Sequence, residues 1–265
     1  MPLPVVDNAY TTVPLRGKKS ALYRRYVQLE DDRSSWRSHW MEITDYISPR
    51  RGRYLTESQN SKGRKRTTKI IDSTGTQAMR TMAAGLMSGM TSPARPWHRR
   101  KVRDDLMDDG EVRSWLAQVE QIERAILHKS NFYNSIHTVY TELGSFGTAP
   151  LYRQPSFDEV IRFRPFTAGE YVIAENDQGV VDTLGRDFTM TVGQIVQKFV
   201  HKPDGSMDWR GVSKATHKLW DDGNYDARVE VVHMIEPRLM ADRDYDKKDS
   251  KNMPFKSCYF ELSSE

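Results

Sequence analysis

The chain has 265 residues, of which 37% are hydrophobic and 29% are charged, so it can bury a substantial core in one large domain or two small ones. No apolar run reaches the ~20 residues that a membrane-spanning helix needs, and the stretch MPLPVVDNAY has neither the basic region nor the apolar core of a secretory signal. The single cysteine, Cys258, excludes an internal disulfide, and the isolated histidines argue against a structural zinc site. We therefore expect no cofactor, no metal and no membrane partner.

The net charge of +4 is concentrated in one stretch. Residues 50–69 hold eight basic residues against one glutamate, whereas the rest of the chain holds 32 basic residues against 35 acidic ones. Glycine, serine and amide side chains without apolar periodicity predict a mobile basic loop here. Such a loop attracts phosphates without reading base sequence, and an acidic patch on a protein partner is an equally good alternative. The candidate DNA- or partner-binding residues are Arg50, Arg51, Arg53, Lys62, Arg64, Lys65, Arg66 and Lys69.

A long helix is predicted over residues 18–48, because apolar and aromatic side chains recur there at steps of three and four. Trp36, Trp40 and Ile43 lie in this apolar seam. The tryptophans are large surfaces to leave in water, so these three residues are candidates for a contact between subunits. An ordinary core helix that packs on its own domain is at least as good an interpretation.

A second helix is predicted over about 72–91, where small and apolar residues alternate before two prolines. Asp72 and Ser73 are candidate N-cap residues. Each glycine in the helix lowers its propensity by about 1 kcal/mol relative to alanine, so we expect another backbone to approach closely, and we take Gly85 and Gly89 as candidate interface residues. The predicted buried face consists of Ile71, Ala78, Met82, Gly85, Leu86 and Met90.

Two more helices are predicted, at about 110–129 and 131–145, the first with Trp115 and Ile122 among its inward residues. From Thr148 onward the pattern changes to short strands, with a hairpin turn at residues 176–179. Thr191 and Gln194 have the spacing of a capping box, which predicts a helix that begins there and ends at about Val200. The order of helices first and sheet later indicates an α+β fold in which N-terminal helices pack with a mostly antiparallel sheet. The predicted division is an N-terminal arm and long helix at 1–49, the basic loop at 50–69 and an α+β domain at 70–265.

No motif for catalysis stands out in the sequence. A phosphate-binding loop of the form G-x-x-x-x-G-K-[ST] is missing, and we expect no enzyme and no catalytic residue. Four aspartates at 104, 105, 108 and 109 could bind a divalent cation for phosphoryl transfer, but a solvated acidic turn before a helix is the better interpretation. Residues 95–103 form a second basic cluster and a further candidate for phosphate or partner contacts, and salt bridges to Asp104 and Asp105, or to another subunit, are the leading alternative.

Four stretches of the chain, in order, closely resemble the head-to-tail connecting, or portal, proteins of short-tailed bacteriophages. The first contains D-S-T-G-T-Q-A and A-A-G-L-M-S-G-M-T-S-P-A-R-P-W within residues 70–97. The others are SNFYNSIHTVYTELGSFGTAPLY at 130–152, GEYVIAENDQGVVDTLGRDFTMTVGQIVQKF at 169–199 and VVHMIEPR at 231–238. Four such strings in sequence make a chance match improbable, whereas residues 1–69 match only through a long helix and a basic loop.

The resemblance implies a structural subunit of the portal ring, at one vertex of the capsid in the virion. Such a ring, a dodecamer of this subunit assembled in the host cytoplasm, is the conduit for packaging and ejection of double-stranded DNA and the attachment site of the tail. It implies as partners the terminase motor, the major capsid or scaffold protein and a tail adaptor. Portal polypeptides are longer than this chain, so the resemblance assigns 70–265 to the wing-like region, before stem, clip and crown. The residues alone leave open a monomeric, sequence-independent nucleic-acid-binding module that acts through the basic loop.

Overall fold

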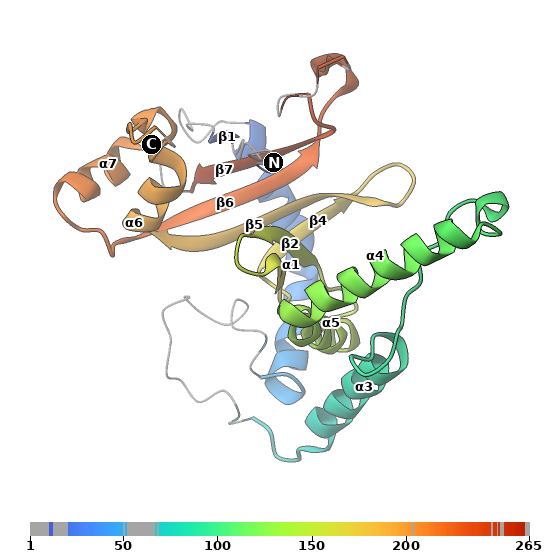
Figure 1. Cartoon of the computed structure of the whole chain (residues 1–265). Coiled ribbons are helices and arrows are strands. Elements are labelled where there is room, and N and C mark those ends of the chain that lie inside the picture. The colour runs from blue at the N-terminus through green and yellow to red at the C-terminus, as the bar shows by residue number, and fades with distance from the viewer. Residues whose placement is uncertain are drawn as a thin grey trace. The chain divides into compact units, whose positions relative to one another are not determined.

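The chain forms two compact units that both combine helices and strands. The computed structural model describes residues 11–12, 21–49, 51, 67, 69–202, 204–244, 246–247, 249 and 252–262 (Figure 1). Unit 1 consists of Met1–Trp36 and Glu170–Glu265, and unit 2 of Arg37–Gly169. The predicted α+β class is confirmed. The predicted domain boundaries at residues 49 and 69 stay predictions.

Helix α1 (Ala21–Tyr46) begins in unit 1 and ends in unit 2. The other helices of unit 2 are α3 (Thr74–Met90), the short η1 (Asp104–Leu106), α4 (Gly110–Lys129) and α5 (Phe132–Phe146), and its hairpin consists of β2 (Leu151–Ser156) and β3 (Val160–Pro165). Unit 1 contains β1 (Thr11–Thr12), β4 (Tyr171–Glu175), β5 (Val181–Thr191), β6 (Arg228–Pro237) and β7 (Phe255–Glu261). Its short helices are α6 (Val192–Ile195), η2 (Val196–Val200), η3 (Trp209–Gly211), α7 (Lys214–Asp221) and η4 (Met240–Asp242).

The five strands of unit 1 form one sheet in the order β1-β7-β6-β5-β4, antiparallel except for the parallel β1–β7 pair. The predicted hairpin joins β4 to β5. Asn176 builds its turn, because its side-chain oxygen accepts hydrogen bonds from the amides of Gln178 and Val180, and Gly179 takes a φ of 74°. The predicted capping box is also confirmed. The Thr191 side chain accepts a hydrogen bond from the Gln194 amide, and the Gln194 side chain accepts one from the Thr191 amide.

The two faces of this sheet pack on different helices, as the alternation of a strand requires. On one face, Val232 and Met234 pack with Tyr26 of α1. A Cβ added to Gly185 would lie 2.6 Å from Met234 Sδ and 3.2 Å from Tyr26, so the glycine lets the first half of α1 approach the sheet. On the opposite face, Val231 packs in a core that α6, η2 and α7 cover (Figure 1).

A row of paired residues crosses the sheet of unit 1 on that second face. Arg186 of β5 pairs with His233 of β6, which pairs with Tyr259 of β7. The His233 ring stacks on Tyr259 with 4.0 Å between centroids, and its Nε2 lies 2.8 Å from Ser257 Oγ. Burial, and then the charges of Arg186 and Lys198, lower the pKa of His233 from 6.5 to about 3. His233 is therefore neutral in the folded chain at neutral pH.

This buried histidine predicts a loss of stability in acid. Below pH 6.5, His233 becomes protonated in the unfolded chain. In the folded chain it stays neutral down to about pH 3. Each pH unit in that window then costs up to about 1.4 kcal/mol of unfolding free energy. We expect urea unfolding at pH 7 and pH 4.5 to show a smaller pH dependence for His233→Gln than for the parent chain. Equal pH dependence of the two proteins would contradict the assignment.

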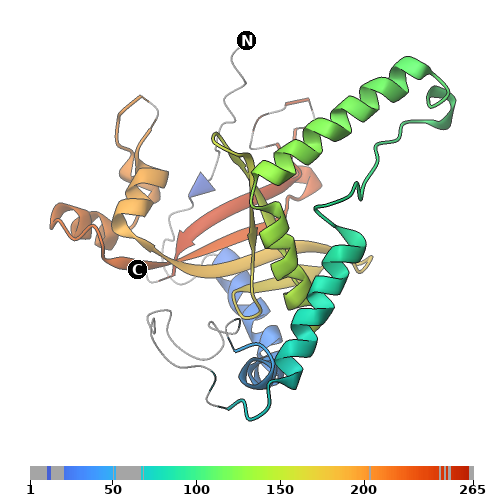
Figure 2. The ribbon, with the colours of Figure 1, turned by 60° about the horizontal axis from the view of Figure 1, so that its bottom comes forward.

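Helix α5 is the centre of unit 2. Helix α3 packs along it, and an added Cβ at Gly144 would overlap the side chain of Met82. The β2–β3 hairpin is tied to the start of α5 by Asn131, which donates to the Phe163 carbonyl at 2.7 Å and accepts from the Phe163 amide at 2.8 Å. Figure 2 shows α4 extending beyond α5.

Two predicted buried faces in unit 2 are wrong. Of the predicted face of α3, Met82 and Met90 are exposed and Ile71 is fully exposed, whereas Ala83 is the buried residue. In α4, Trp115 and Ile122 are exposed. The bounds of α3 and α4 were predicted within two residues, but periodicity shows only that a helix has an apolar side, and not whether its own chain covers it.

Candidate assembly and nucleic-acid contact surfaces

The predicted basic loop lies largely outside the described residues. Arg50, Arg53, Lys62, Arg64, Lys65 and Arg66 are among the residues that the structure does not describe. The other two candidates, Arg51 and Lys69, both form ion pairs within the chain. These two residues stand at the beginning and the end of the basic stretch.

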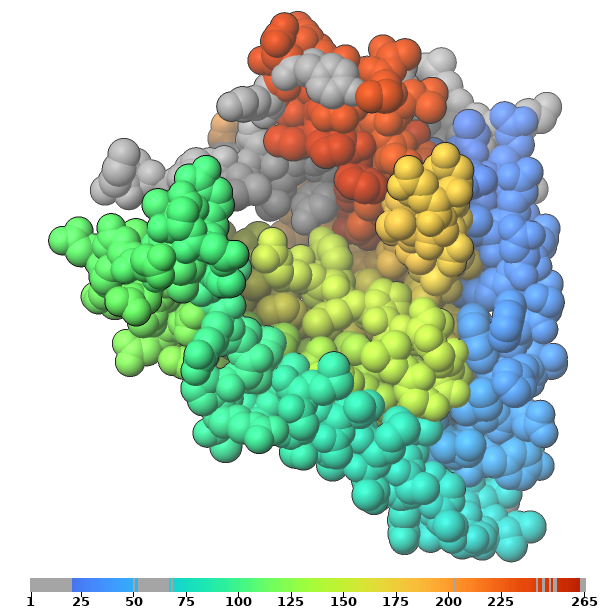
Figure 3. All heavy atoms as spheres, turned by 90° about the vertical axis from the view of Figure 1, so that its right-hand side faces the viewer, coloured from blue at the N-terminus to red at the C-terminus, as the bar shows by residue number. Residues whose placement is uncertain are grey.

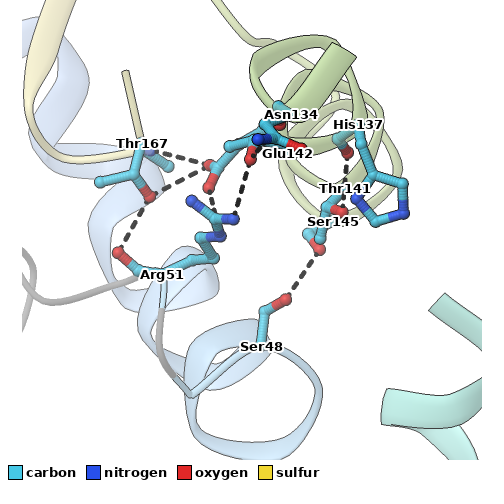
Figure 4. Close-up of polar contacts among 10 residues, drawn as sticks. Ser48, Arg51, Asn134, His137, Thr141, Glu142, Ser145 and Thr167 are labelled. Atoms are coloured by element: carbon cyan, nitrogen blue, oxygen red, sulfur yellow. Dashed lines mark hydrogen bonds and ion pairs between the residues drawn. The ribbon is translucent and has the colours of Figure 1, made fainter. Parts of the chain in front are cut away.

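Arg51 belongs to a polar cluster around the buried carboxylate of Glu142 (Figure 4). Glu142 Oε1 lies 3.6 Å from Arg51 Nε, and Oε2 accepts from Thr167 Oγ1 at 3.1 Å and from the Ala168 amide at 3.2 Å. Thr167 Oγ1 also lies 2.9 Å from the Arg51 carbonyl oxygen. Because a buried carboxylate needs hydrogen bonds and a counter-charge, Glu142 holds Arg51 in place on α5.

The same face of α5 contributes two more contacts at helical spacing. Arg51 Nη2 donates to Thr138 Oγ1 at 3.2 Å, and Ser145 Oγ lies 3.2 Å from Ser48 Oγ (Figure 4). Thr138, Glu142 and Ser145 stand four and three residues apart, so they project from one side of the helix. The chain segment that leads from α1 into the basic stretch is thereby fixed to α5.

The other end of the basic stretch is fixed to α1. Lys69 Nζ lies 2.6 Å from Asp45 Oδ2, and Thr76 Oγ1 at the start of α3 donates to the Ile47 carbonyl at 3.0 Å. In the sequence, Arg51 and Lys69 are ordinary members of the basic set, and Glu142 was not predicted as a partner of either. Glu142 lies about 100° around the helix from Leu143 and the apolar positions near it, so helical periodicity gave no signal for it.

The second basic cluster forms the salt bridges to Asp104 and Asp105 that its alternative interpretation requires. Lys101 Nζ lies 2.6 Å from Asp104 Oδ1, and Arg103 Nη2 lies 2.8 Å from Asp105 Oδ2. Arg100 binds Glu123 of α4 through its guanidinium, and these hydrogen bonds hold the pKa of Glu123 below its usual value. The segment 97–103 is thereby attached along one side of α4.

The acidic turn acts at the start of α4. The side chain of Asp109 accepts a hydrogen bond of 2.8 Å from the Glu111 amide and so caps the helix. Within the described ranges, no three His, Cys, Asp or Glu side chains come together as a metal site. Among the same residues, no helix is long and apolar enough to cross a bilayer.

The candidate interface residues have different surroundings. Trp40 is 8% exposed and packs with Phe146 and Ala168, and Ile43 packs against the same cluster. This is the core position that the alternative interpretation of the long helix requires. Trp36 is 59% exposed. The outer side of α3 is open toward the described residues, because a Cβ at Gly85 or Gly89 would meet none of their heavy atoms within 4 Å. The intersubunit role of these residues stays a prediction.

The described part of the chain thus has exposed apolar side chains on two helices of unit 2, and it includes the ion pairs of Arg51 and Lys69 at the two ends of the basic stretch. The family model of the bacteriophage head to tail connecting protein matches residues 19–265, and the chain belongs to this family. It is 45% identical over 249 residues to the "Probable portal protein" of Bordetella phage BPP-1. It is 42% identical over the same length to the "Portal protein" of Salmonella phage epsilon15.

Each of these alignments covers 94% of this chain and 43% of the relative. The chain therefore spans less than half the length of the curated relatives that it matches. The family resemblance inferred from residues 70–240 is confirmed. The comparisons give no support to the alternative of a monomeric nucleic-acid-binding module.

Proposed function

We propose that this chain is the wing-forming portion of a phage portal subunit, in a ring at the capsid vertex through which DNA is packaged and ejected. The observation that supports this proposal is the family match over residues 19–265, together with relatives named as portal proteins. In a closed ring, one surface of each subunit contacts a different surface of the next subunit. The predicted ring is a dodecamer with no enzymatic role.

The proposed partners follow from the same assignment. The ring would sit in the virion, assembled in the host cytoplasm, with the terminase motor, the major capsid or scaffold protein and a tail adaptor as its neighbours. Residues 70–265 would supply the wing-like region, and the long helix with Trp36 would adjoin a neighbouring subunit. Native mass spectrometry of the assembled protein tests the ring directly.

We also propose that the basic stretch contacts DNA within this ring. The ion pairs of Arg51 with Glu142 and of Lys69 with Asp45 attach both of its ends to unit 2. The charge between these ends is then presented from a fixed base on each subunit. Many copies around a ring multiply a weak phosphate contact. An acidic patch on a neighbouring subunit, scaffold or capsid protein is the competing partner.

Removing charge from the basic stretch is expected to lower the salt dependence of DNA binding. The variant Arg64→Ala/Lys65→Ala/Arg66→Ala removes three cations, and each lost phosphate contact reduces the slope of log K against log salt by about 0.9. Fluorescence anisotropy with a labelled duplex at several salt concentrations measures this slope. The control Arg153→Ala/Lys214→Ala/Lys218→Ala removes the same charge from exposed positions elsewhere. Equal slopes for both variants would favour a protein partner.

A further inference from the structure

Helix α4 carries two large apolar side chains that the described chain leaves in solvent. Trp115 is 59% exposed and Ile122 is 60% exposed, and their spacing of seven residues places them on one side of the helix. We call these two residues the α4 row. Single exposed apolar residues are ordinary on protein surfaces, but large ones that adjoin a longer apolar surface indicate an interaction site.

The apolar side of α4 is wider than the part that its own chain covers. Val119 and Ile126 lie between the α4 row and Leu116, which is 6% exposed. Arg113 and Arg124 lie on the opposite side of the helix. The α4 row is therefore the uncovered edge of one continuous apolar surface, of which the other edge is already buried in unit 2.

Helix α3, in the same unit, has an exposed face of small side chains, in contrast to the large apolar side chains of the α4 row. Its outer face is formed by exposed, uncharged and mostly small residues, namely Ala78, Thr81, Gly85, Ser88 and Gly89. Nothing lies within 4 Å of an added Cβ at either glycine, so no packing within the described residues accounts for the helix propensity that the glycines cost. A shallow face without charge accommodates bulky apolar side chains from a partner.

The charges at the ends of the two helices complement each other in one direction. Glu111 and Lys129 stand at the start and the end of α4. Asp72 precedes α3, and the Arg95 guanidinium donates to the Ser88 and Gly89 carbonyls at the end of α3, at 2.7 and 3.2 Å. In an antiparallel pair each acid meets a base, whereas a parallel pair would place like charges together. The lengths also agree, at about 30 Å and about 26 Å.

We propose that the α4 row of one copy of this chain packs antiparallel on the outer face of α3 of the next copy. The inference rests on the proposed ring, because it supplies the two unlike surfaces that a closed ring needs on each subunit. Figure 3 shows α3 and the beginning of α4 both at the surface of unit 2. Each copy then offers α4 to one neighbour and α3 to the other.

Cysteine cross-linking of the purified protein tests the contact. The antiparallel arrangement places Gln118 of one copy opposite Gly85 of the next, and the native Cys258 is buried. We expect Gln118→Cys/Gly85→Cys to give a ladder of covalent multimers after mild oxidation, which a reductant removes. Each single variant should give none. The matched control is Ala117→Cys/Gly85→Cys, because residue 117 points about 100° away from residue 118, and it should give no ladder.

The outcomes separate this contact from the ring itself. Rings in native mass spectrometry without a ladder, or with an equal ladder from the control pair, would overturn the contact and leave the ring standing. Folded protein without rings would instead overturn the proposed function. A second test uses charge: Glu111→Arg and Arg95→Glu should each reduce the fraction of protein in rings, and the combination should restore it. No restoration in the combined variant would count against the antiparallel arrangement.

Discussion

Replacing Glu142 with alanine is expected to lower the unfolding free energy of unit 2 by about 2–3 kcal/mol, because it leaves the Ala168 amide without an acceptor and removes the counter-charge of the half-buried Arg51 side chain. The Glu142 carboxylate is fully buried. It accepts hydrogen bonds from Thr167 Oγ1 and the Ala168 amide and forms an ion pair with the Arg51 guanidinium. Chemical denaturation, followed by circular dichroism, measures the change.

Glu142→Gln is the matched control for this prediction. It keeps the size of the side chain and one oxygen acceptor but removes the charge that faces Arg51. We expect a smaller loss for this variant, of about 1 kcal/mol, the usual net contribution of one hydrogen bond. A loss below about 1 kcal/mol for Glu142→Ala would show that the cluster does not stabilise the base of the basic stretch.

Trp40→Ala is expected to cost about 3–5 kcal/mol of unfolding free energy, the usual range for deletion of a buried aromatic side chain. Trp40 is 8% exposed and packs with Phe146 and Ala168. The matched variant Trp36→Ala removes the same side chain four residues earlier on α1, where it is 59% exposed. We expect a stability change within about 0.5 kcal/mol there, as for ordinary surface substitutions.

Measured together, the two tryptophan variants separate a core role from an interface role. Urea unfolding reports the stability of each, and native mass spectrometry reports ring formation. From the structure we expect Trp40→Ala mainly to lower the unfolding free energy. From the proposed function we expect Trp36→Ala mainly to lower the fraction of protein in rings. A stable Trp40→Ala variant that fails only in ring formation would contradict the core assignment.

Local features of this chain were predictable from its sequence. The capping box of Thr191 with Gln194 and the hairpin turn at Asn176 were both predicted, because each depends on side-chain contacts within a few residues. The bounds of α4 were predicted as well, since its cap at Asp109 and its apolar period both stand in the sequence. The family was recognisable from its ordered sequence strings, which need no structural model.

Features that depend on distant contacts were not predictable. Glu142 meets Arg51 and Thr167 across separations of 91 and 25 residues, and no periodicity indicates such pairs. The covered side of α4 was also missed. Its apolar residues continue around the helix from Leu116 to Trp115, and the sequence does not show where the contact with α5 and the segment 97–103 stops.

The most direct test of the proposed ring is native mass spectrometry of the purified chain at moderate salt, alongside a version extended beyond Glu265. We expect closed rings of about a dozen copies, with the extended version as the decisive sample, because the unlike surfaces of each subunit join copies in one direction until the rotation closes. A clean monomer in both versions, with salt-sensitive DNA binding, would contradict it.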